Sequence, residues 1–328
     1  MKAWLLNQIG DGIDGLRLSE VPDPKPAENE VVLKVRYAAI NPADRYLAEG
    51  QYPAKPPVPH VLGRDGFGEV IAIGPGVKGI AIGDRRTILR GETGVSRAGT
   101  LAQFVTVAAT ELVEPPAGWN EQQSAAAALV YLTAYQALTQ WGDLPPGVVL
   151  ITGASGGVGV AGTQLAAAMG HTVVGLSRSA EKGQRLKELG ARAVFDPQDQ
   201  NWRQALKEFL GGGRVDLIID NIGGELFSQV IDTLGMWGKV SVVGRLAGPV
   251  PQFNTASLFF RRARIGGVAV GSYSNAESRA AWEAACALLE QTGAKPLIDS
   301  VFPFDQVPRA FAQLAKGPMG KVVVEVNA

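Results

Sequence analysis

The first third of the chain alternates short apolar runs with glycine- and proline-rich breaks. Three such runs lie at residues 31–37, 68–74 and 101–107. Runs of this length, with Gly and Pro on either side, are typical of strands in a compact β domain. We therefore expect strands at these three places.

After residue 120 the pattern changes to helices that alternate with strands. The Ala-rich stretch 121–139 has helical spacing, with Asn120 as a cap. Beyond it, apolar runs predict strands at 148–151, 172–176, 193–195, 215–219, 239–243 and 265–270, with helices at 160–169, 180–189, 202–210 and 226–234 between them. This alternation indicates βαβ units in a parallel, doubly wound sheet, and six strands are the number in a complete dinucleotide-binding (Rossmann) fold.

The end of the chain predicts a helix at 278–291 and a strand at 322–326, which we expect to return to the first domain. The predicted fold class is therefore α/β. It combines a six-stranded Rossmann domain over residues 123–272 with a β domain built from residues 1–122 and 273–328.

Composition excludes several classes of protein. Among the 328 residues, Lys+Arg and Asp+Glu are 31 each, so the zero net charge gives no electrostatic footprint for nucleic acid or an anionic membrane. Cys286 is the single cysteine, which excludes an intrachain disulfide and a Cys-rich zinc site. The apolar stretch 125–138 is too short to span a bilayer, and the first residues lack the apolar core of a signal peptide. We expect a cytoplasmic protein without nucleic-acid or membrane partners.

A glycine-rich turn follows the first strand of the predicted parallel sheet. Gly153, Gly156 and Gly159 have the spacing G-x-x-G-x-x-G, between an apolar strand and a helix. Glycine at these places allows a tight turn, a close approach of a pyrophosphate to the backbone and close helix–strand packing. The free N–H groups at the start of the helix would then face the phosphates. The turn predicts a dinucleotide site.

The end of the second parallel strand indicates which dinucleotide is bound. An NAD-preferring site carries Asp or Glu there, whereas this chain has the neutral Ser177 followed by Arg178. An arginine can stack on adenine and bind the oxygens of a 2′-phosphate, and Lys182 adds a second cation. We therefore expect NADPH as the cofactor.

Two other enzyme classes share parts of this pattern. Residues 153–157 also read G-x-S-x-G, the nucleophile turn of α/β hydrolases, but His171 is the only histidine after Ser155 and no acid lies between them. Short-chain dehydrogenases need Tyr-x-x-x-Lys, and none of the six tyrosines has a lysine four residues later. Both classes are therefore excluded.

The whole chain resembles the zinc-independent quinone oxidoreductases of the medium-chain dehydrogenase/reductase family. The stretches that carry the resemblance are 32–35 leading into 40–44, 83–85, 132–135, 153–159, 190–191, 216–224 and 320–323. The resemblance implies a GroES-like β domain beside the Rossmann domain, an active site in the cleft, and a homodimer. The exposed edge strand at 265–270 suits pairing with a second copy.

The zinc alcohol dehydrogenases of the same family differ at the metal site. They place a metal-binding Cys where this chain has Asn41, and their Gly-His-Glu segment becomes Gly63-Arg64-Asp65 here. Their structural cysteine quartet is absent. We therefore expect no metal.

The resemblance implies hydride transfer from NADPH to a quinone or another α,β-unsaturated carbonyl. Without a metal, hydrogen-bond donors must stabilise the oxygen on which charge develops, and Asn41, Tyr46 and Tyr52 are the candidates. By resemblance, the further cofactor contacts are Thr133, Ser155, Gly156, Gly157, Val158, Asn221, Gly244, Arg245 and Lys321.

Two alternatives share this fold and cofactor. The first is a 2-enoyl thioester reductase, in which Tyr52 would act as the donor. The second is a redox sensor that binds NADPH without turnover.

Overall fold

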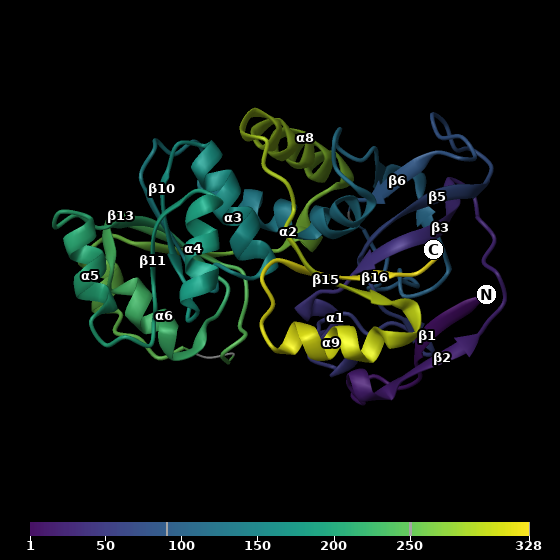
Figure 1. The fold of residues 1–328 in the computed structure, drawn as a ribbon, viewed down its shortest axis with the longest axis horizontal. Coiled ribbons are helices and arrows are strands. Elements are labelled where there is room, and N and C mark those ends of the chain that lie inside the picture. Colours follow the sequence, from purple (N-terminus) through teal and green to yellow (C-terminus); the bar gives the residue numbers. More distant parts are fainter. Residues whose placement is uncertain (90, 249–250, 328) are drawn as a thin grey trace. The chain divides into compact units, whose positions relative to one another are not determined.

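The computed structural model describes residues 1–89, 91–248 and 251–327. They form two compact units (Figure 1). Unit 1 comprises Met1–Leu129, Tyr273–Trp282 and Lys295–Ala328, and unit 2 comprises Val130–Ser272 and Glu283–Ala294. Two helices, α2 (Glu121–Thr139) and α8 (Asn275–Thr292), contribute residues to both units. Each unit is described by itself below.

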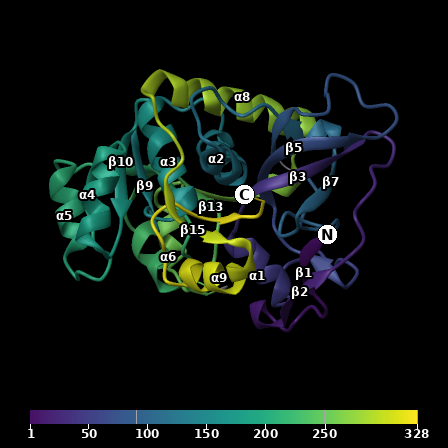
Figure 2. The same ribbon diagram turned by 45° about the vertical axis from the view of Figure 1, so that its right-hand side comes forward.

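Unit 1 is built on a mostly antiparallel sheet with the order β15-β16-β3-β5-β6-β8, and β7 also pairs with β3. A second, smaller sheet has the order β2-β1-β4. Its paired strands β1 and β2 are labelled in Figure 2. The strands are β1 (Lys2–Leu6), β2 (Leu16–Glu20), β3 (Glu30–Ala39), β4 (His60–Val61), β5 (Asp65–Ile73), β6 (Arg85–Ile88), β7 (Phe104–Ala108), β8 (Leu112–Val113), β15 (Ile298–Pro303) and β16 (Lys321–Glu325). The helices are α1 (Pro42–Ala48) and α9 (Val307–Ala315), with 3₁₀ turns at Ile13–Gly15, Ala109–Glu111 and Phe304–Gln306.

Strand β3 is the centre of unit 1. Its residues Val31, Leu33 and Val35 are buried in one core, together with Leu47 of α1 and Ile88 of β6. The strand pairs with β5 and β7, and also with β16 from the far end of the chain. These pairings bring the ends of β3, β5 and β16 side by side.

The run expected as a strand at 101–107 forms one only from Phe104. Leu101 accepts a hydrogen bond from the backbone N–H of Trp4, and Ala102 forms a bridge with Ala3. The first residues of this run therefore pair with β1 rather than with β3. This competing partner is not visible in the sequence pattern.

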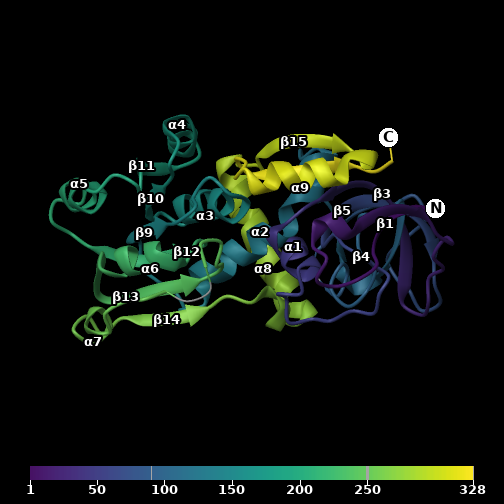
Figure 3. The same ribbon diagram turned by 90° about the horizontal axis from the view of Figure 1, so that it is seen from below.

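Unit 2 contains six parallel strands in the order β11-β10-β9-β12-β13-β14 (Figure 3). They are β9 (Val148–Ile151), β10 (Thr172–Leu176), β11 (Ala191–Phe195), β12 (Val215–Asp220), β13 (Leu234–Val242) and β14 (Arg264–Gly267). Counted within the unit, the order is 3-2-1-4-5-6, which is the order of a doubly wound Rossmann sheet. The predicted α/β fold class is confirmed.

The helices of unit 2 connect these strands. They are α3 (Gly157–Ala168), α4 (Ala180–Glu188), α5 (Trp202–Phe209), α6 (Gly224–Ile231) and α7 (Ala256–Phe259), with a 3₁₀ turn at Val270–Ser272. Side chains such as Leu150, Ile218 and Val240 form a buried core with Trp202 of α5 and Phe227 of α6. None of the helices in the described part of the chain is long and apolar enough to cross a membrane.

The strand expected at 239–243 begins earlier, at Leu234. Between the pairs Val215–Leu234 and Leu217–Lys239, strand β12 advances by two residues and β13 by five. Trp237 adopts a positive φ of 62° inside this bulge. Because the bulge interrupts the apolar period, the sequence pattern shows only the regular second half of the strand.

Candidate functional site

The glycine-rich turn between β9 and α3 is shaped by backbone contacts. Gly153 has a φ of +57°, which favours glycine. A Cβ on Gly159 would lie 2.4 Å from the carbonyl oxygen of Gly153, so only glycine lets α3 approach the turn this closely. By contrast, Gly156 caps α3 with an ordinary φ of −74°, and a Cβ there would meet one atom only, at 3.4 Å. The turn therefore has an open face at the start of α3.

The carboxyl ends of β9 and β12 meet beside this turn. Thr152 Oγ1 donates to Asp220 Oδ1 at 2.7 Å and accepts from the backbone N–H of Asn221 at 2.9 Å. Asn221 Nδ2 donates to the carbonyl of Thr152 at 2.8 Å, whereas its buried Oδ1 has no hydrogen-bond partner among the described residues. Strand order reverses between β9 and β12, and folds of this type bind ligands at that point.

Asp220 ties the neighbouring loops to the same edge of the sheet. Burial raises the pKa of its carboxyl, against hydrogen bonds from Thr152, Gly223 and Ile222 that lower it. Its backbone carbonyl accepts from the N–H of Gly244, 3.2 Å away. A Cβ on Gly244 would lie 2.5 Å from the carbonyl oxygen of Asn221, so this loop also needs glycine.

The expected cofactor contacts in unit 2 fall into three groups. Ser155 to Val158 form the turn and the start of α3, while Asn221 and Gly244 follow β12 and β13, with the exposed Arg245 next to Gly244. Thr133 is buried in α2. At the end of β10, Ser179 caps α4 by accepting from the N–H of Lys182. Ser177 and Arg178 lie just before this cap, and Arg178 is exposed, without an ion pair in the described part of the chain.

Unit 1 holds a buried polar cluster, Asn41–Asp65–Lys321. Lys321 Nζ donates to Asn41 Oδ1 at 2.5 Å and to Asp65 Oδ2 at 3.0 Å. Asn41 Nδ2 also donates to Asp65 Oδ2, at 3.0 Å. The three residues are only 4%, 1% and 4% exposed, in chain order. Two of them, Asn41 and Lys321, were expected site residues, and Asp65 was not.

Asn41 also begins the helix that follows. Its backbone N–H donates to Asp44 Oδ2 at 2.8 Å, and Pro42 occupies the first position of α1. Asp44 is completely buried, and burial raises the pKa of its carboxyl to about 6, although the nearby charge of Arg64 lowers it. The cluster and the helix cap thus share Asn41.

The tyrosine candidates lie on α1 and just after it. Arg64 Nη1 donates to the phenolic oxygen of Tyr52 at 3.1 Å, and the guanidinium lies 5.2 Å from the centre of the same ring. Because the arginine uses an acceptor position of the phenol, the O–H of Tyr52 remains a possible donor. Tyr46 lies under the guanidinium of Arg45, 5.4 Å from its ring centre.

The residues that sequence reasoning missed are those that hold the candidates in place. Asp65 and Arg64 were considered only as replacements for metal ligands, and Thr152 and Asp220 drew no attention. Asp220 stands directly before Asn221 at the end of an apolar strand, so its position was a usable signal. The partnership of Asp65 with Lys321 spans 256 residues and gave no local signal.

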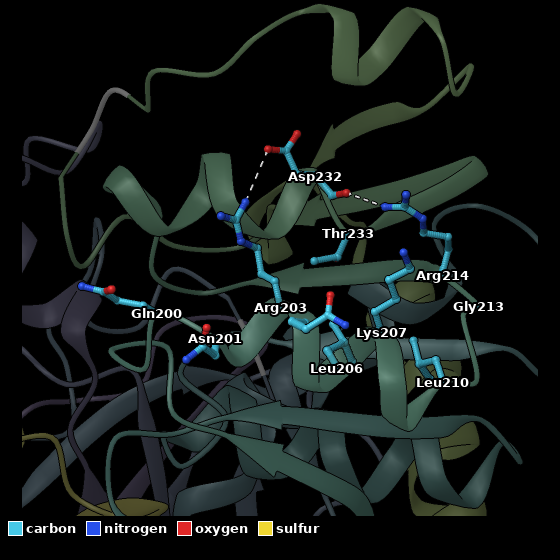
Figure 4. Close-up of a pocket in the computed structure, with 11 residues that line it drawn as sticks. Gln200, Asn201, Arg203, Leu206, Lys207, Leu210, Gly213, Arg214, Asp232 and Thr233 are labelled. Atoms are coloured by element: carbon cyan, nitrogen blue, oxygen red, sulfur yellow. Dashed lines mark hydrogen bonds and ion pairs between the residues drawn. The ribbon is translucent and has the colours of Figure 1, made fainter.

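A separate pocket lies on α5 and around the turns before β12 and after α6 (Figure 4). Arg203 and Arg214 both point to Asp232 there (Figure 4). The residues that line it include none of the candidates. Burial raises the pKa of the Cys286 thiol to about 12, which disfavours the reactive thiolate.

Known families and individual proteins are similar to this chain over most of its length. Family models match at residues 27–117 (alcohol dehydrogenase GroES-like domain) and at residues 157–291 (zinc-binding dehydrogenase). The quinone oxidoreductase of Lama guanicoe is 32% identical over 329 residues, which cover 99% of this chain and 97% of that protein.

Solved structures with the same fold include an NAD-dependent alcohol dehydrogenase, with a TM-score of 0.91 and 29% identity over all of both chains. Another is the Escherichia coli quinone oxidoreductase complexed with NADPH. Its TM-score is 0.89 and its identity 26%, covering 99% of this chain and all of the other. The chain therefore belongs to the quinone oxidoreductase group of the medium-chain dehydrogenase/reductase family, and it is an oxidoreductase.

Proposed function

We propose that this protein is an NADPH-dependent reductase that transfers a hydride, without a metal, to quinones or other α,β-unsaturated carbonyls. When bound, NADPH supplies the hydride from its dihydronicotinamide ring. The observation that carries the proposal is the glycine turn, whose open face at Gly156 adjoins the start of α3. The relative from E. coli, which is named as a complex with NADPH, supports the same cofactor class.

The residues of unit 2 fit such a cofactor. Ser155, Gly156, Gly157 and Val158 would hold the pyrophosphate, since free backbone N–H groups at a helix start attract anions. The unpartnered Oδ1 of Asn221 offers a buried acceptor at the point where the strand order reverses. Thr133, Gly244 and Arg245 would contribute further contacts.

The choice of NADPH over NADH rests on the end of β10. Ser177, Arg178 and Lys182 supply a hydroxyl and two cations, and no acid follows the strand before Glu181. A 2′-phosphate would bind to Arg178 and Lys182. Since another relative is named as NAD-dependent, a direct comparison of both dinucleotides is needed.

In unit 1, Tyr52 would donate a hydrogen bond to the acceptor oxygen on which negative charge develops. Arg64 donates a hydrogen bond to the phenolic oxygen of Tyr52. The positive charge of the guanidinium would polarise the phenol and so strengthen it as a hydrogen-bond donor. Tyr46 is the second proposed donor, whereas the amide of Asn41, the third candidate, is bonded to Lys321 and Asp65.

Replacing Tyr52 with Phe tests this role. We expect kcat to fall by about 10- to 100-fold, while the Kd for NADPH stays unchanged because the dinucleotide is assigned to unit 2. Tyr37→Phe is the matched control, since the hydroxyl of Tyr37 donates to Glu325 in the same unit. An unchanged kcat in Tyr52→Phe would remove Tyr52 from the proposal.

A zinc ion does not fit the residues present. Among residues 1–89, 91–248 and 251–327 there is no group of three or more His, Cys, Asp or Glu side chains that could hold a metal. Asn41 and Asp65 face an ammonium instead. We expect the purified protein to contain no stoichiometric zinc and to keep its activity after prolonged incubation with a chelator.

We also propose a cytoplasmic homodimer. Strand β14 pairs with β13 on one side and is the edge of its sheet on the other. Ile265 in this strand, Phe259 at the end of α7 and the following Phe260 are large exposed apolar residues. Multi-angle light scattering should give twice the chain mass of 34.5 kDa, and a monomer mass would reject the dimer.

An assay at 340 nm tests the whole proposal. NADPH would be incubated with the protein and a series of quinones, enones and enoyl-CoA thioesters. We expect NADPH oxidation with quinones or enones, whereas turnover of enoyl-CoA alone would favour a thioester reductase. NADPH binding without oxidation of any acceptor would indicate a redox sensor.

A further inference from the structure

Lys321 is placed in the cluster of unit 1 by strand pairing. Ala39, at the end of β3, pairs with Val323 of β16 on one side and with Asp65 of β5 on the other. Lys321 begins β16, and Asp65 begins β5. Their side chains therefore meet across the end of β3, and Asn41 lies two residues beyond that end.

The hydrogen bonds of the cluster fix the amide of Asn41 in one orientation. An ammonium has donors only, so the atom of Asn41 that faces Lys321 Nζ must be the oxygen. The nitrogen then donates to Asp65 Oδ2, with a longer contact of 3.4 Å to the carbonyl of Ala39. Asp65 Oδ1 accepts from the backbone N–H of Leu129 at 3.1 Å. Both ends of the amide are therefore engaged within the protein.

This geometry changes the role that Asn41 can take. With its side chain 4% exposed and its amide bonded to Lys321 and Asp65, Asn41 is better suited to anchor α1 than to donate to a substrate. The helix that it begins carries Tyr46, and Gln51, just before Tyr52, donates its backbone N–H to the carbonyl of Tyr46 at 2.8 Å. A continuous chain of contacts thus leads from the cluster to both tyrosines.

We propose that Lys321 is a positioning residue of the reductase reaction: its ammonium is a built-in cation that locks Asn41 and Asp65, and through Asn41 it fixes the segment that carries Tyr46 and Tyr52. The ammonium also occupies the space between Asn41 Oδ1 and Asp65 Oδ2, so these two oxygens are not available to a divalent cation. This inference rests on the proposed function for its kinetic consequence. The contacts that define it lie within unit 1.

The test combines Lys321→Met, Asp65→Asn and the double variant. Each single change leaves a buried charge without its partner, so we expect both to lower the urea midpoint of unfolding markedly. The double variant removes both charges, and we expect it to recover most of the lost stability. Lys316→Met, which changes an exposed lysine of the same unit, should leave the midpoint unchanged.

The folded double variant separates positioning from charge neutralisation. We expect its kcat to stay at least about tenfold below that of the unaltered protein, with the Kd for NADPH within about threefold. Amide hydrogen exchange measured without cofactor should become faster in α1 and stay unchanged in unit 2. If the double variant recovers both kcat and slow amide exchange in α1, Lys321 only neutralises the charge of Asp65. If the double variant does not fold, the cluster serves stability alone. Either result would overturn the proposal.

Cobalt titration of the unaltered protein tests the second part. We expect no d–d absorption from bound Co²⁺, because the ammonium holds the place of a metal. A Co²⁺ band that zinc abolishes and that is lost in Asp65→Asn would contradict this. Failure of the unaltered protein to bind NADPH or oxidise it would instead refute the proposed function, and would leave the exchange and cobalt results to decide on Lys321.

Discussion

The glycine turn of unit 2 and the Asn41–Asp65–Lys321 cluster of unit 1 are built in opposite ways. The turn lies within seven consecutive residues, 153–159, and its shape depends on main-chain contacts that only glycine permits. The cluster joins residues from both ends of the chain and depends on side-chain hydrogen bonds inside a core. The turn can thus be read from a local pattern, whereas the cluster exists only once the sheet has formed.

Because the two sites are built differently, substitutions in them should impair different properties of the protein. A change in the turn should act on cofactor binding, through the space left for the backbone and the phosphates. A change in the cluster should act on stability and on the placement of α1. Three substitutions in unit 2 and one in unit 1 test this contrast.

Gly159→Ala should have the largest effect. Its Cβ would lie 2.4 Å and 2.5 Å from the carbonyl oxygens of Gly153 and Ala154, so the backbone of the turn must move. We expect a loss of about 3 kcal/mol or more in the free energy of unfolding, together with loss of NADPH binding, both measurable by urea unfolding and calorimetry. Gly162→Ala in the same helix is the control, because its Cβ would meet only side-chain atoms at 3.4 Å or beyond. Equal stability of the two variants would contradict the packing argument.

Gly156→Ala separates binding from folding. The backbone there suits any residue, and the added methyl group has open space, on the face where the phosphates are proposed to bind. We expect an unchanged unfolding midpoint and an NADPH Kd raised by at least about tenfold. If NADPH binds this variant as tightly as the unaltered protein, the pyrophosphate does not lie on that face.

Arg178→Ala should change the choice of dinucleotide. A charge-assisted bond to a phosphate contributes about 1.5–3 kcal/mol, so the Kd for NADPH should rise by about 10- to 100-fold, while the Kd for NADH stays constant. Arg192→Ala serves as the control. Arg192 is exposed near the amino end of β11, whereas Arg178 follows the carboxyl end of the neighbouring parallel strand β10. Parallel losses for both dinucleotides would assign Arg178 to something other than the 2′-phosphate.

Asp44 should affect stability through a pH dependence. Burial raises the pKa of its carboxyl from 3.8 to about 6 in the folded protein, so the folded state binds the proton more tightly than the unfolded state. Its contribution to stability therefore falls as pH rises from about 4 to 6, by roughly 2–3 kcal/mol in total, and Asp44→Asn lacks this loss. Urea unfolding of both proteins at pH 4, 5 and 7 measures the difference. A difference that does not vary with pH would show that Asp44 does not carry the raised pKa.

The sequence predicts most of unit 2 because its signals are local. Five of its six strands overlap apolar runs of three to six residues, and the three glycines mark the turn. The bulge at 235–238 is the exception, because a bulge interrupts the apolar period that the prediction uses. Arg178 and Asn221 are candidates because they follow predicted strands.

Unit 1 is predicted less well because its strands and its polar cluster depend on contacts between residues far apart in the sequence. Strands β4 and β8 have two residues each, which is too short for a period. Leu101 and Ala102, the start of the strand expected at 101–107, pair with β1 instead of extending β7. Lys321 was expected near the cofactor, and the structure places its ammonium on Asn41 and Asp65. Only the pairing of β16 with β3 explains this position, and no local pattern encodes it.

Calorimetric titration of the unaltered protein with NADPH and with NADH shows whether unit 2 binds a dinucleotide and which one it prefers. We expect one NADPH bound per chain, at least about tenfold more tightly than NADH. The absence of heat in both titrations would contradict the proposed cofactor site.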